Sequence, residues 1–110
     1  MALNKKNRLK KKRDFEDVFK KGRAVKGSFL FIKYRNNKLG VSRFGFVVSA
    51  KVARKAVERN KIRRVLSEAV RGVIDGLAGY DIIVFATRKI MAVPKEDIVE
   101  DFLGALKKIQ

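Results

Sequence analysis

Apolar residues recur with a helical period in three segments of the chain, at residues 14–21, 56–73 and 95–109. Spacings of three and four residues place such positions on one face of a helix. Asp14 precedes the first of these faces and is predicted to be its N-cap. Gly22 follows the first segment and Pro94 precedes the last, as expected at helix ends. The apolar positions are Phe15, Val18 and Phe19; then Ile62, Val65, Leu66, Ala69, Val70 and Val73; then Ile98, Phe102, Leu106 and Ile109.

Three other segments are rich in aromatic and β-branched residues and predict strands. They are residues 28–35 (SFLFIKYR), 44–49 (FGFVVS) and 81–86 (DIIVFA). A turn at residues 36–40 begins with Asn-Asn and ends with Gly, so the first two strands are predicted to form an antiparallel hairpin. Residues 23–27 are predicted to add a short edge strand.

These elements follow one another in the order α-β-β-β-α-β-α. The order predicts the α+β class: a two-layer α/β sandwich in which helices pack on a small, mostly antiparallel sheet, with one βαβ crossover. The chain has 110 residues and contains no internal repeat or low-complexity linker, so residues 1–110 are predicted to form a single domain.

Charge is the most unusual feature of the composition. The chain has 28 Lys and Arg against 11 Asp and Glu, a net charge of +17. Residues 1–71 hold 23 of the basic and 5 of the acidic side chains, whereas residues 72–110 hold 5 and 6. Because so much positive charge in a small domain opposes compaction, its position on the first two thirds of the chain indicates a polyanionic partner.

The chain contains no Cys and no His, which excludes disulfides, thiolate chemistry, the usual zinc ligands and imidazole acid–base catalysis. No protein metal site or cofactor is predicted. The absence of Cys is compatible with a reducing cytosol. No apolar run approaches the ~20 residues of a membrane span. The basic N-terminus lacks the apolar segment of a signal peptide. We therefore expect a cytoplasmic protein without a membrane partner.

Two segments carry most of the cations. The first is a basic arm at residues 1–13, which is either a frayed terminus or a segment that orders on nucleic acid. The second is residues 51–71, where eight cations face only Glu58 and Glu68, so a surface of i,i+4 ion pairs fits poorly and phosphate binding is favoured. The arm cations include Arg8, Lys10, Lys11, Lys12 and Arg13; the candidates of the second segment are Lys51, Arg54, Lys55, Arg59, Asn60, Lys61, Arg63, Arg64 and Arg71.

The stretch R-N-K-I-R-R at residues 59–64 resembles the RNR signature of the bacterial ribonuclease P protein component. Three other segments are similar to the same family, in the same order and at matching spacing. They are R-L-K-K-K-R-D-F-E-x-V-F at residues 8–19, S-R-F-G-F-V-V-S at 42–49 and D-I-I-V-F-A at 81–86. The resemblance covers most of the chain.

This resemblance implies a protein subunit that carries no catalytic residue. In the family a catalytic RNA with its magnesium ions removes the 5′ leader of precursor tRNA, while the protein binds both that RNA and the leader. The resemblance further implies that the βαβ crossover is left-handed and that the signature residues face the catalytic RNA, with the cations before the helix extending that surface. The signature residues are Arg59, Asn60, Lys61, Arg63 and Arg64, and the extending cations are Lys51, Arg54 and Lys55. Ser67 stands where the family often has a basic residue, and Ala53 and Arg54 stand where a Gly is common; Arg71 is a candidate to supply the missing phosphate contact.

The resemblance also implies a cleft between the short first helix and the sheet, where the leader binds. Phe15 and Phe19 are expected to line it, and the candidates from the sheet are Phe29, Phe31, Phe44 and Phe46. Splayed RNA bases stack on such aromatic side chains. The alternative is that Phe15 and Phe19 are simply core residues, as is usual for Phe at i and i+4 of a short helix.

Three other classes of protein compete with this interpretation. A ribosomal or other structural RNA-binding protein is equally small and basic. A DNA-binding helix protein would need several uncharged base-reading side chains on residues 56–72, where only Asn60 and Ser67 qualify. A protein-only nuclease would need an acidic cluster that the basic region lacks. The signature and its flanking strands favour ribonuclease P, with no DNA partner.

Overall fold

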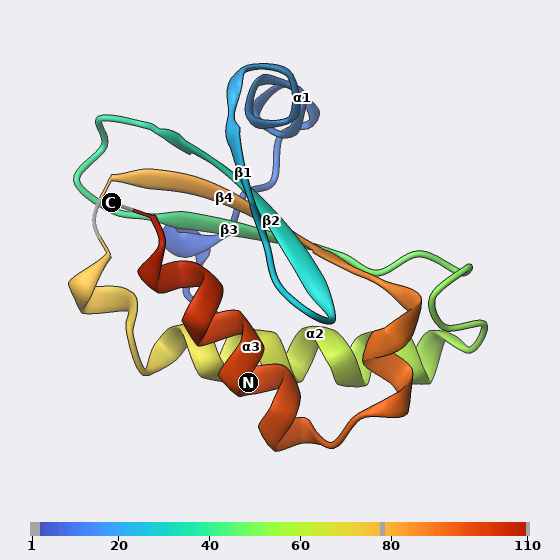
Figure 1. Cartoon of the computed structure of the whole chain (residues 1–110). Coiled ribbons are helices and arrows are strands. Elements are labelled where there is room, and N and C mark those ends of the chain that lie inside the picture. Colours follow the sequence, from blue (N-terminus) through green and yellow to red (C-terminus); the bar gives the residue numbers. More distant parts are fainter. Residues whose placement is uncertain (1–2, 78, 110) are drawn as a thin grey trace.

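The computed structural model describes residues 3–77 and 79–109, which contain three helices and one four-stranded sheet (Figure 1). Every predicted helix and strand is present, with bounds within two residues of those predicted. The helices are α1 (Lys12–Lys21), α2 (Ala56–Arg71) and α3 (Lys95–Lys107); the strands are β1 (Arg23–Lys26), β2 (Leu30–Asn36), β3 (Arg43–Val47) and β4 (Tyr80–Ala86). Short 3-10 turns lie at Lys5–Asn7, Ile74–Gly76 and Arg88–Ala92.

The sheet has the strand order β1-β2-β4-β3. β1 pairs with β2 and β2 with β4, both antiparallel, whereas β3 and β4 are parallel. The predicted hairpin between the second and third strands is therefore wrong, because β4 lies between them. β4 is suited to this central position: Ile82, Ile83 and Val84 are consecutive and all buried, so both of its faces need apolar cover.

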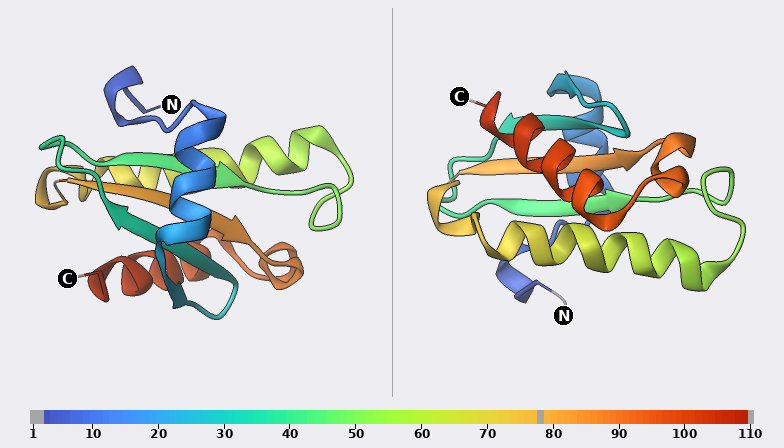
Figure 2. Two further views of the ribbon diagram at one scale, coloured as in Figure 1. Left: turned by 90° about the horizontal axis from the view of Figure 1, so that it is seen from above. Right: turned by 60° about the horizontal axis from the view of Figure 1, so that its bottom comes forward.

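The connection from β3 through α2 to β4 is a βαβ crossover. In the right panel of Figure 2, α2 lies in front of the sheet, both strands point to the right, and β4 lies above β3. This arrangement is left-handed, as the resemblance implied, whereas nearly all such crossovers are right-handed. The hand of the crossover decides which side of β3 receives the central strand.

The main core lies between one face of the sheet and the two long helices, α2 and α3 (Figure 1). The predicted apolar stripes of both helices face the sheet, and α2 also packs directly on α3. Because the apolar stripe of α2 is buried, its opposite face is left to polar and charged side chains. The most deeply buried members of this core are Leu30, Ile32, Phe44, Leu66, Val70, Ile82, Val84, Ile90, Phe102 and Ile109.

Helix α1 lies on the opposite face of the sheet, where it forms a second and much smaller core (Figure 1). The buried residues of this cluster are Leu9, Val18 and Ile83, with Phe15 and Phe85 packed against them. The α+β class is confirmed; the two predicted layers hold the main core, and α1 covers part of the other face of the sheet. That face is only thinly covered.

The start of α1 differs from the prediction. The helix begins at Lys12, and Lys11 occupies the N-cap position without a side-chain cap hydrogen bond. Asp14 lies in the first turn, and its carboxylate is 3.4 Å from Nη1 of Arg43 on β3. The prediction that Asp14 caps the helix is wrong because its carboxylate is engaged by an arginine that is distant in the sequence.

Residues 3–9 of the basic arm lie along the edge strand β3, whereas residues 1 and 2 are outside the described residues and residues 12 and 13 belong to α1. Leu3 and Leu9 are buried, and the amide of Leu9 donates a 2.8 Å hydrogen bond to the carbonyl of Phe44. Arg8 forms a parallel bridge with Phe44, and Nδ2 of Asn7 donates to the carbonyl of Ser42 at 2.9 Å. The arm therefore covers part of a sheet edge that would otherwise present unpaired backbone groups.

Asp101 of α3 ties the β1–β2 hairpin to the helical layer, which leads to a prediction about stability. Its carboxylate accepts the backbone amides of Ser28 and Phe29 at 2.7 and 2.9 Å. Asp101→Ala should lower the free energy of unfolding by about 1–3 kcal/mol, because two charge-assisted bonds are lost. Urea unfolding measures this loss. The exposed neighbour Glu100 is the control, and equal midpoints for Asp101→Ala and Glu100→Ala would contradict the assignment.

Candidate RNA-binding surfaces

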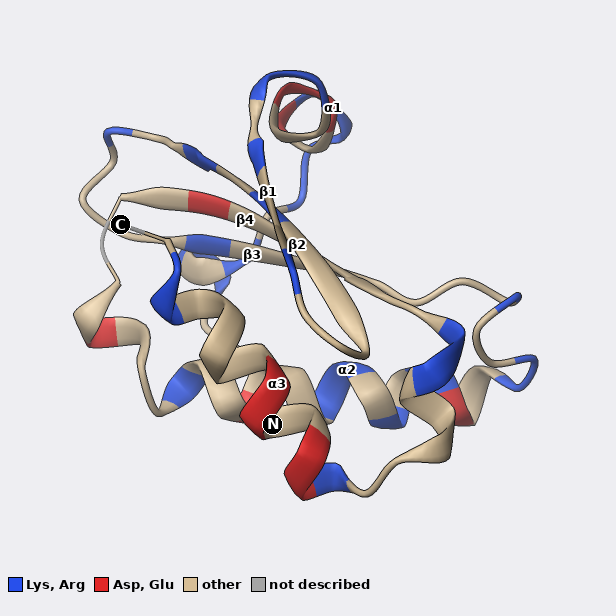
Figure 3. Ribbon diagram, viewed as in Figure 1, with Lys and Arg blue, Asp and Glu red and all other residues tan. Residues whose placement is uncertain are grey.

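The first candidate site is the outward face of α2 together with the loop that precedes it, here called the α2 surface. Its side chains point away from the sheet because Ile62, Val65 and Leu66 anchor the opposite face of the helix. All but two of its predicted members are exposed, and Figure 3 shows Lys and Arg along this helix. The exposed members are Lys51, Arg54, Lys55, Asn60, Lys61, Arg64 and Arg71.

Arg59 and Arg63 are half-buried, and both are bonded to the loop before α2. Nη1 of Arg59 donates to the carbonyls of Ala53 and Arg54, each at 2.9 Å. Nη1 of Arg63 donates to Oδ1 of Asn60 at 2.9 Å, and its Nη2 lies 3.4 Å from the carbonyl of Val48. Two of the signature residues therefore hold the loop and helix in a fixed relation, while Lys61 and Arg64 present their charges outward.

Two positions depart from the family pattern, and the structure shows what surrounds them. Ala53 is buried, and its carbonyl is one of the two that Arg59 bonds. Ser67 is half-exposed and lines a cavity of about 430 Å³ together with Arg63. Arg71 is exposed at the last residue of α2.

The same cavity joins the basic arm to the α2 surface. Arg8 and Lys10 of the arm line it together with Arg63, and Phe15 of α1 contributes to its wall. The sequence predicted the arm and the helix as separate basic segments. The structure brings them together across the β3 edge, because the arm pairs with β3 and α2 packs beneath that strand.

The second candidate site is a group of side chains beside α1 on the thinly covered face of the sheet, here called the aromatic surface. Phe31 and Phe85 stack with ring centroids 4.7 Å apart, and Phe19 meets Phe85 edge-on at 6.1 Å. Phe19 remains 54% exposed. Nζ of Lys33 lies 4.0 Å from the centroid of the Phe19 ring and donates to the Phe19 carbonyl at 2.9 Å. The three rings form a partly exposed aromatic surface beside the ammonium group of Lys33.

Phe15 lies one turn before Phe19 on the same helix and is half-buried. Its ring packs directly on the backbone of β3, where a Cβ at position 45 would lie 2.5 Å from two of its ring carbons. Gly45 is therefore needed for the close approach of α1 to the sheet. Phe15 is half-buried and packs in the smaller core, and it also lines the cavity of about 430 Å³. The exposure of Phe19 does not fit a purely core residue.

Three of the four sheet candidates do not face α1: Phe44 is buried in the main core, and Phe29 and Phe46 pack against it. Phe29 precedes β2 and packs against the main core, where its backbone is bonded to Asp101 and Thr87. Phe31 in contrast points to the α1 face, as alternation along β2 requires. A strand assignment that begins at residue 28 could not show which aromatic residues face α1.

Sequence reasoning missed Phe85 and Lys33. Residues 82–86 are uniformly apolar because β4 is covered on both faces, so the alternation of this strand is hidden. Once Ile82 and Val84 are placed in the main core, Ile83 and Phe85 must face α1. Lys33 faces the same way as Phe31, two residues earlier on β2.

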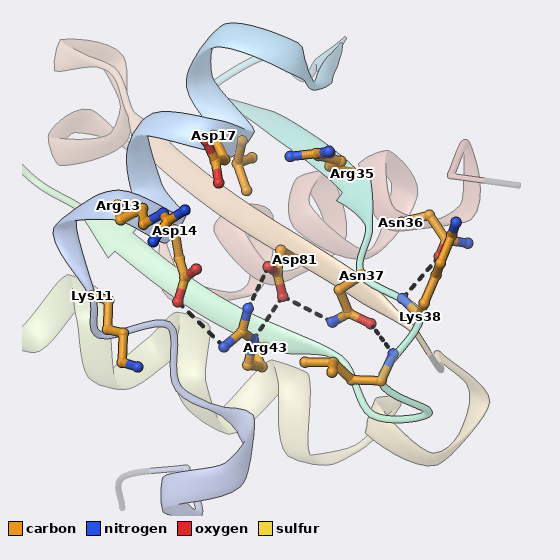
Figure 4. A pocket seen from close by; sticks show the side chains of 12 residues that line it. Lys11, Arg13, Asp14, Asp17, Arg35, Asn36, Asn37, Lys38, Arg43 and Asp81 are labelled. Carbon is orange, nitrogen blue, oxygen red and sulfur yellow. Dashed lines mark hydrogen bonds and ion pairs between the residues drawn. The ribbon is translucent and has the colours of Figure 1, made fainter.

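A polar cavity of about 570 Å³ lies beside the N-terminal turns of α1, at the end of the sheet opposite the aromatic surface (Figure 4). At its base Arg43 bonds Asp81 twice, through Nε at 2.8 Å and Nη2 at 2.6 Å. Hydrogen bonding to Asp81 raises the pKa of Arg43 above its ordinary value, against the opposing effect of burial. Lys11 and Arg13 of the arm, with Arg35 and Lys38, provide positive charge around the cavity. Lys12 is exposed in the first turn of α1.

Two further findings concern the described residues as a whole. Between residues 3 and 109, leaving out residue 78, no group of three or more acidic side chains is arranged to hold a metal ion. No helix in the same part of the chain is both long and apolar enough to cross a membrane.

Comparison with known proteins gives one consistent result. The family described as Ribonuclease P matches residues 3–110. The ribonuclease P protein component of Syntrophomonas wolfei is 36% identical over 107 residues, which is 96% of this chain and 89% of that one. The corresponding protein of Clostridioides difficile is 36% identical over 110 residues, covering 98% of this chain and 96% of its own.

The fold agrees with solved structures of the same family. The RNase P protein of Thermotoga maritima, in complex with 1-(4-fluorophenyl)-2-thiourea, superposes with a TM-score of 0.86 at 32% identity, covering 94% of this chain and all of that one. The RNase P protein of Staphylococcus aureus gives 0.87 at 32% identity, with 92% and 93% covered. Of the classes that the sequence left open, these matches select ribonuclease P over a ribosomal, DNA-binding or protein-only nuclease function. The chain belongs to the family of bacterial ribonuclease P proteins, the protein subunit of a ribonucleoprotein endoribonuclease that processes the 5′ leader of tRNA.

Proposed function

We propose that the α2 surface binds the catalytic ribonuclease P RNA and that the aromatic surface binds the 5′ leader of precursor tRNA. The protein would thereby assist endonucleolytic removal of the leader without supplying a catalytic residue. The magnesium ions of the reaction would be held by the RNA partner. The chain has no His or Cys, and only 5 of its acidic residues lie in the basic first 71 residues, so it offers few groups for that chemistry.

The exposure of Phe19 is the observation that carries the leader assignment. A Phe that is 54% exposed gains little from burial, yet this one lies against Phe85 and under the ammonium group of Lys33. A base stacked on such a ring would be flanked by a cation that can pair with the adjoining phosphate. This arrangement suits an unpaired strand rather than a duplex.

The α2 surface suits a folded RNA for a different reason. Its cations are mounted on a helix whose other face is locked in the core, and Arg59 and Arg63 fix the preceding loop against it. A rigid array of Lys and Arg releases counterions from phosphates at little cost in ordering. The basic arm extends this array through Arg8 and Lys10, which line one cavity together with Arg63. A protein that binds precursor tRNA would act in the cytoplasm. The absence of Cys from the sequence agrees with this location.

Reconstitution tests the proposal as a whole. The purified protein should not cleave precursor tRNA, whereas its mixture with a bacterial ribonuclease P RNA should cleave at the mature 5′ end, at a lower magnesium concentration than the RNA alone requires. Gel analysis of 5′-labelled precursor over a magnesium series measures both. Cleavage by RNA-free protein would refute the proposal.

Arg64 tests the α2 surface. Binding to the catalytic RNA should weaken with salt by about 0.7–0.9 logarithmic units per phosphate neutralised, and Arg64→Ala should lower this slope by roughly one unit. Its melting temperature should stay near that of the parent because the side chain is exposed. Lys107→Ala, on the last turn of α3, is the matched control for loss of one exposed charge. An unchanged slope for Arg64→Ala, or equal effects of both variants, would contradict the assignment.

Phe19 tests the aromatic surface. Phe19→Ala should weaken binding of precursor tRNA by about 1–3 kcal/mol, the value of one stacked base, and spare mature tRNA, which has no leader. Two binding curves and a thermal melt measure this. Val18→Ala is the contrast: Val18 is buried, so this change should lower stability. If Phe19→Ala lowers the melting temperature as Val18→Ala does and weakens both tRNAs equally, Phe19 is only a packing residue.

A further inference from the structure

Helix α1 is held to the sheet by few contacts. Val18 is the buried residue among its ten. Phe15 rests on the backbone at Gly45, and the Phe19 carbonyl accepts the ammonium group of Lys33 at the other end of the helix. Because this apolar contact area is small, the orientation of α1 and its distance from the sheet depend largely on its polar contacts.

At the N-terminal end of α1, three charged residues from three elements form two successive ion pairs (Figure 4). Asp81 of β4 is buried and fixes the guanidinium of Arg43 on β3 by two hydrogen bonds. Asn37, in the loop after β2, donates to the same carboxylate at 2.8 Å. With Nε and Nη2 engaged, Arg43 directs Nη1 at Asp14 of α1, 3.4 Å away.

A guanidinium held by two bonds to a buried carboxylate has little freedom left to lose when it binds a third group. Arg43 therefore acts as a fixed point on the sheet, and Asp14 is the place where α1 is attached to it. Phe15 and Phe19 follow Asp14 within about one and a half turns of the same helix. A change of tilt at Asp14 is transmitted to Phe19 because the helix between them is rigid.

We propose that Arg43 is a positioning residue. Asp81 holds it in place, it orients α1 through Asp14, and it thereby sets the position of the Phe19 ring relative to the stacked rings of Phe31 and Phe85. The inference rests on the proposed binding of the leader at the aromatic surface. It adds a requirement that the surface alone does not impose, namely that a charge contact at the far end of α1 controls leader affinity.

The test compares two variants of α1 that lose the same charge. Asp14→Ala removes the attachment to Arg43, and Glu16→Ala removes an exposed carboxylate two residues along. Each variant loses one negative charge, so both should gain the same nonspecific attraction to RNA. The difference between their affinities for precursor tRNA therefore reports the Arg43 contact alone. The measured quantity is the dissociation constant of the reconstituted ribonucleoprotein for precursor tRNA with a long leader and with a leader cut back to one nucleotide.

Relative to Glu16→Ala, Asp14→Ala should weaken binding of the long-leader substrate about two- to fivefold, the effect of one partly exposed ion pair. The short-leader substrate should be bound equally by both variants, and Asp14→Glu, which keeps the carboxylate, should restore long-leader affinity. Equal behaviour of Asp14→Ala and Glu16→Ala on the long-leader substrate would overturn the inference.

A double-mutant cycle with Phe19→Ala separates this inference from the function on which it rests. If Asp14 acts by placing Phe19, Asp14→Ala should have no further effect on leader affinity once Phe19 is gone. Additive effects would mean that Asp14 acts independently, and would overturn the inference while leaving leader binding intact. If Phe19→Ala leaves the ratio of the affinities for long-leader and short-leader substrates at the value of the parent protein, leader binding at the aromatic surface is refuted.

Discussion

Burial of β4 on both faces is the constraint on which the rest of the structure depends. Three consecutive residues of this strand, Ile82, Ile83 and Val84, are almost completely inaccessible to solvent. One face is covered by α2 and α3, which together bury most of the apolar side chains. The other face is left to a helix of ten residues and to the arm. The unequal cover leaves aromatic side chains in contact with solvent beside α1, and it directs the charged face of α2 away from them.

Electrostatics follows from the same arrangement. The helix with the strongest positive charge is anchored by an apolar stripe, so its cations are displayed on a rigid support. The acidic residues of the last third of the chain lie mainly on α3, as Figure 3 shows. Positive charge therefore gathers along the β3 edge, from the arm to α2, whereas α3 carries more acidic than basic residues.

The sequence was sufficient to predict the helices and strands and the exposure of most cations on α2, because helical periodicity and local charge are properties of contiguous residues. It failed where the answer depends on pairing between distant segments. The second and third strands are separated by β4, which no local pattern reveals, and the orientation of Phe29 and Phe31 follows only from the register of β2. Arg43 shows the same limit: it reads as one more cation in a basic chain, and only the fold places it between Asp14 and Asp81. Phe85 was hidden because a strand covered on both faces loses its alternation.

The strand order has a consequence for how the molecule is made. β4 is the only link between β3 and the β1–β2 pair within the described sheet, yet it is the last strand to be synthesised. Until residues 80–86 leave the ribosome, the β1–β2 hairpin, β3 and the amphipathic α2 have no common strand on which to assemble. Contacts between segments so far apart in sequence close slowly, because the loop between them must first be ordered. The nascent chain therefore carries a large positive charge and unburied apolar faces at the same time, within reach of ribosomal RNA, until its central strand arrives.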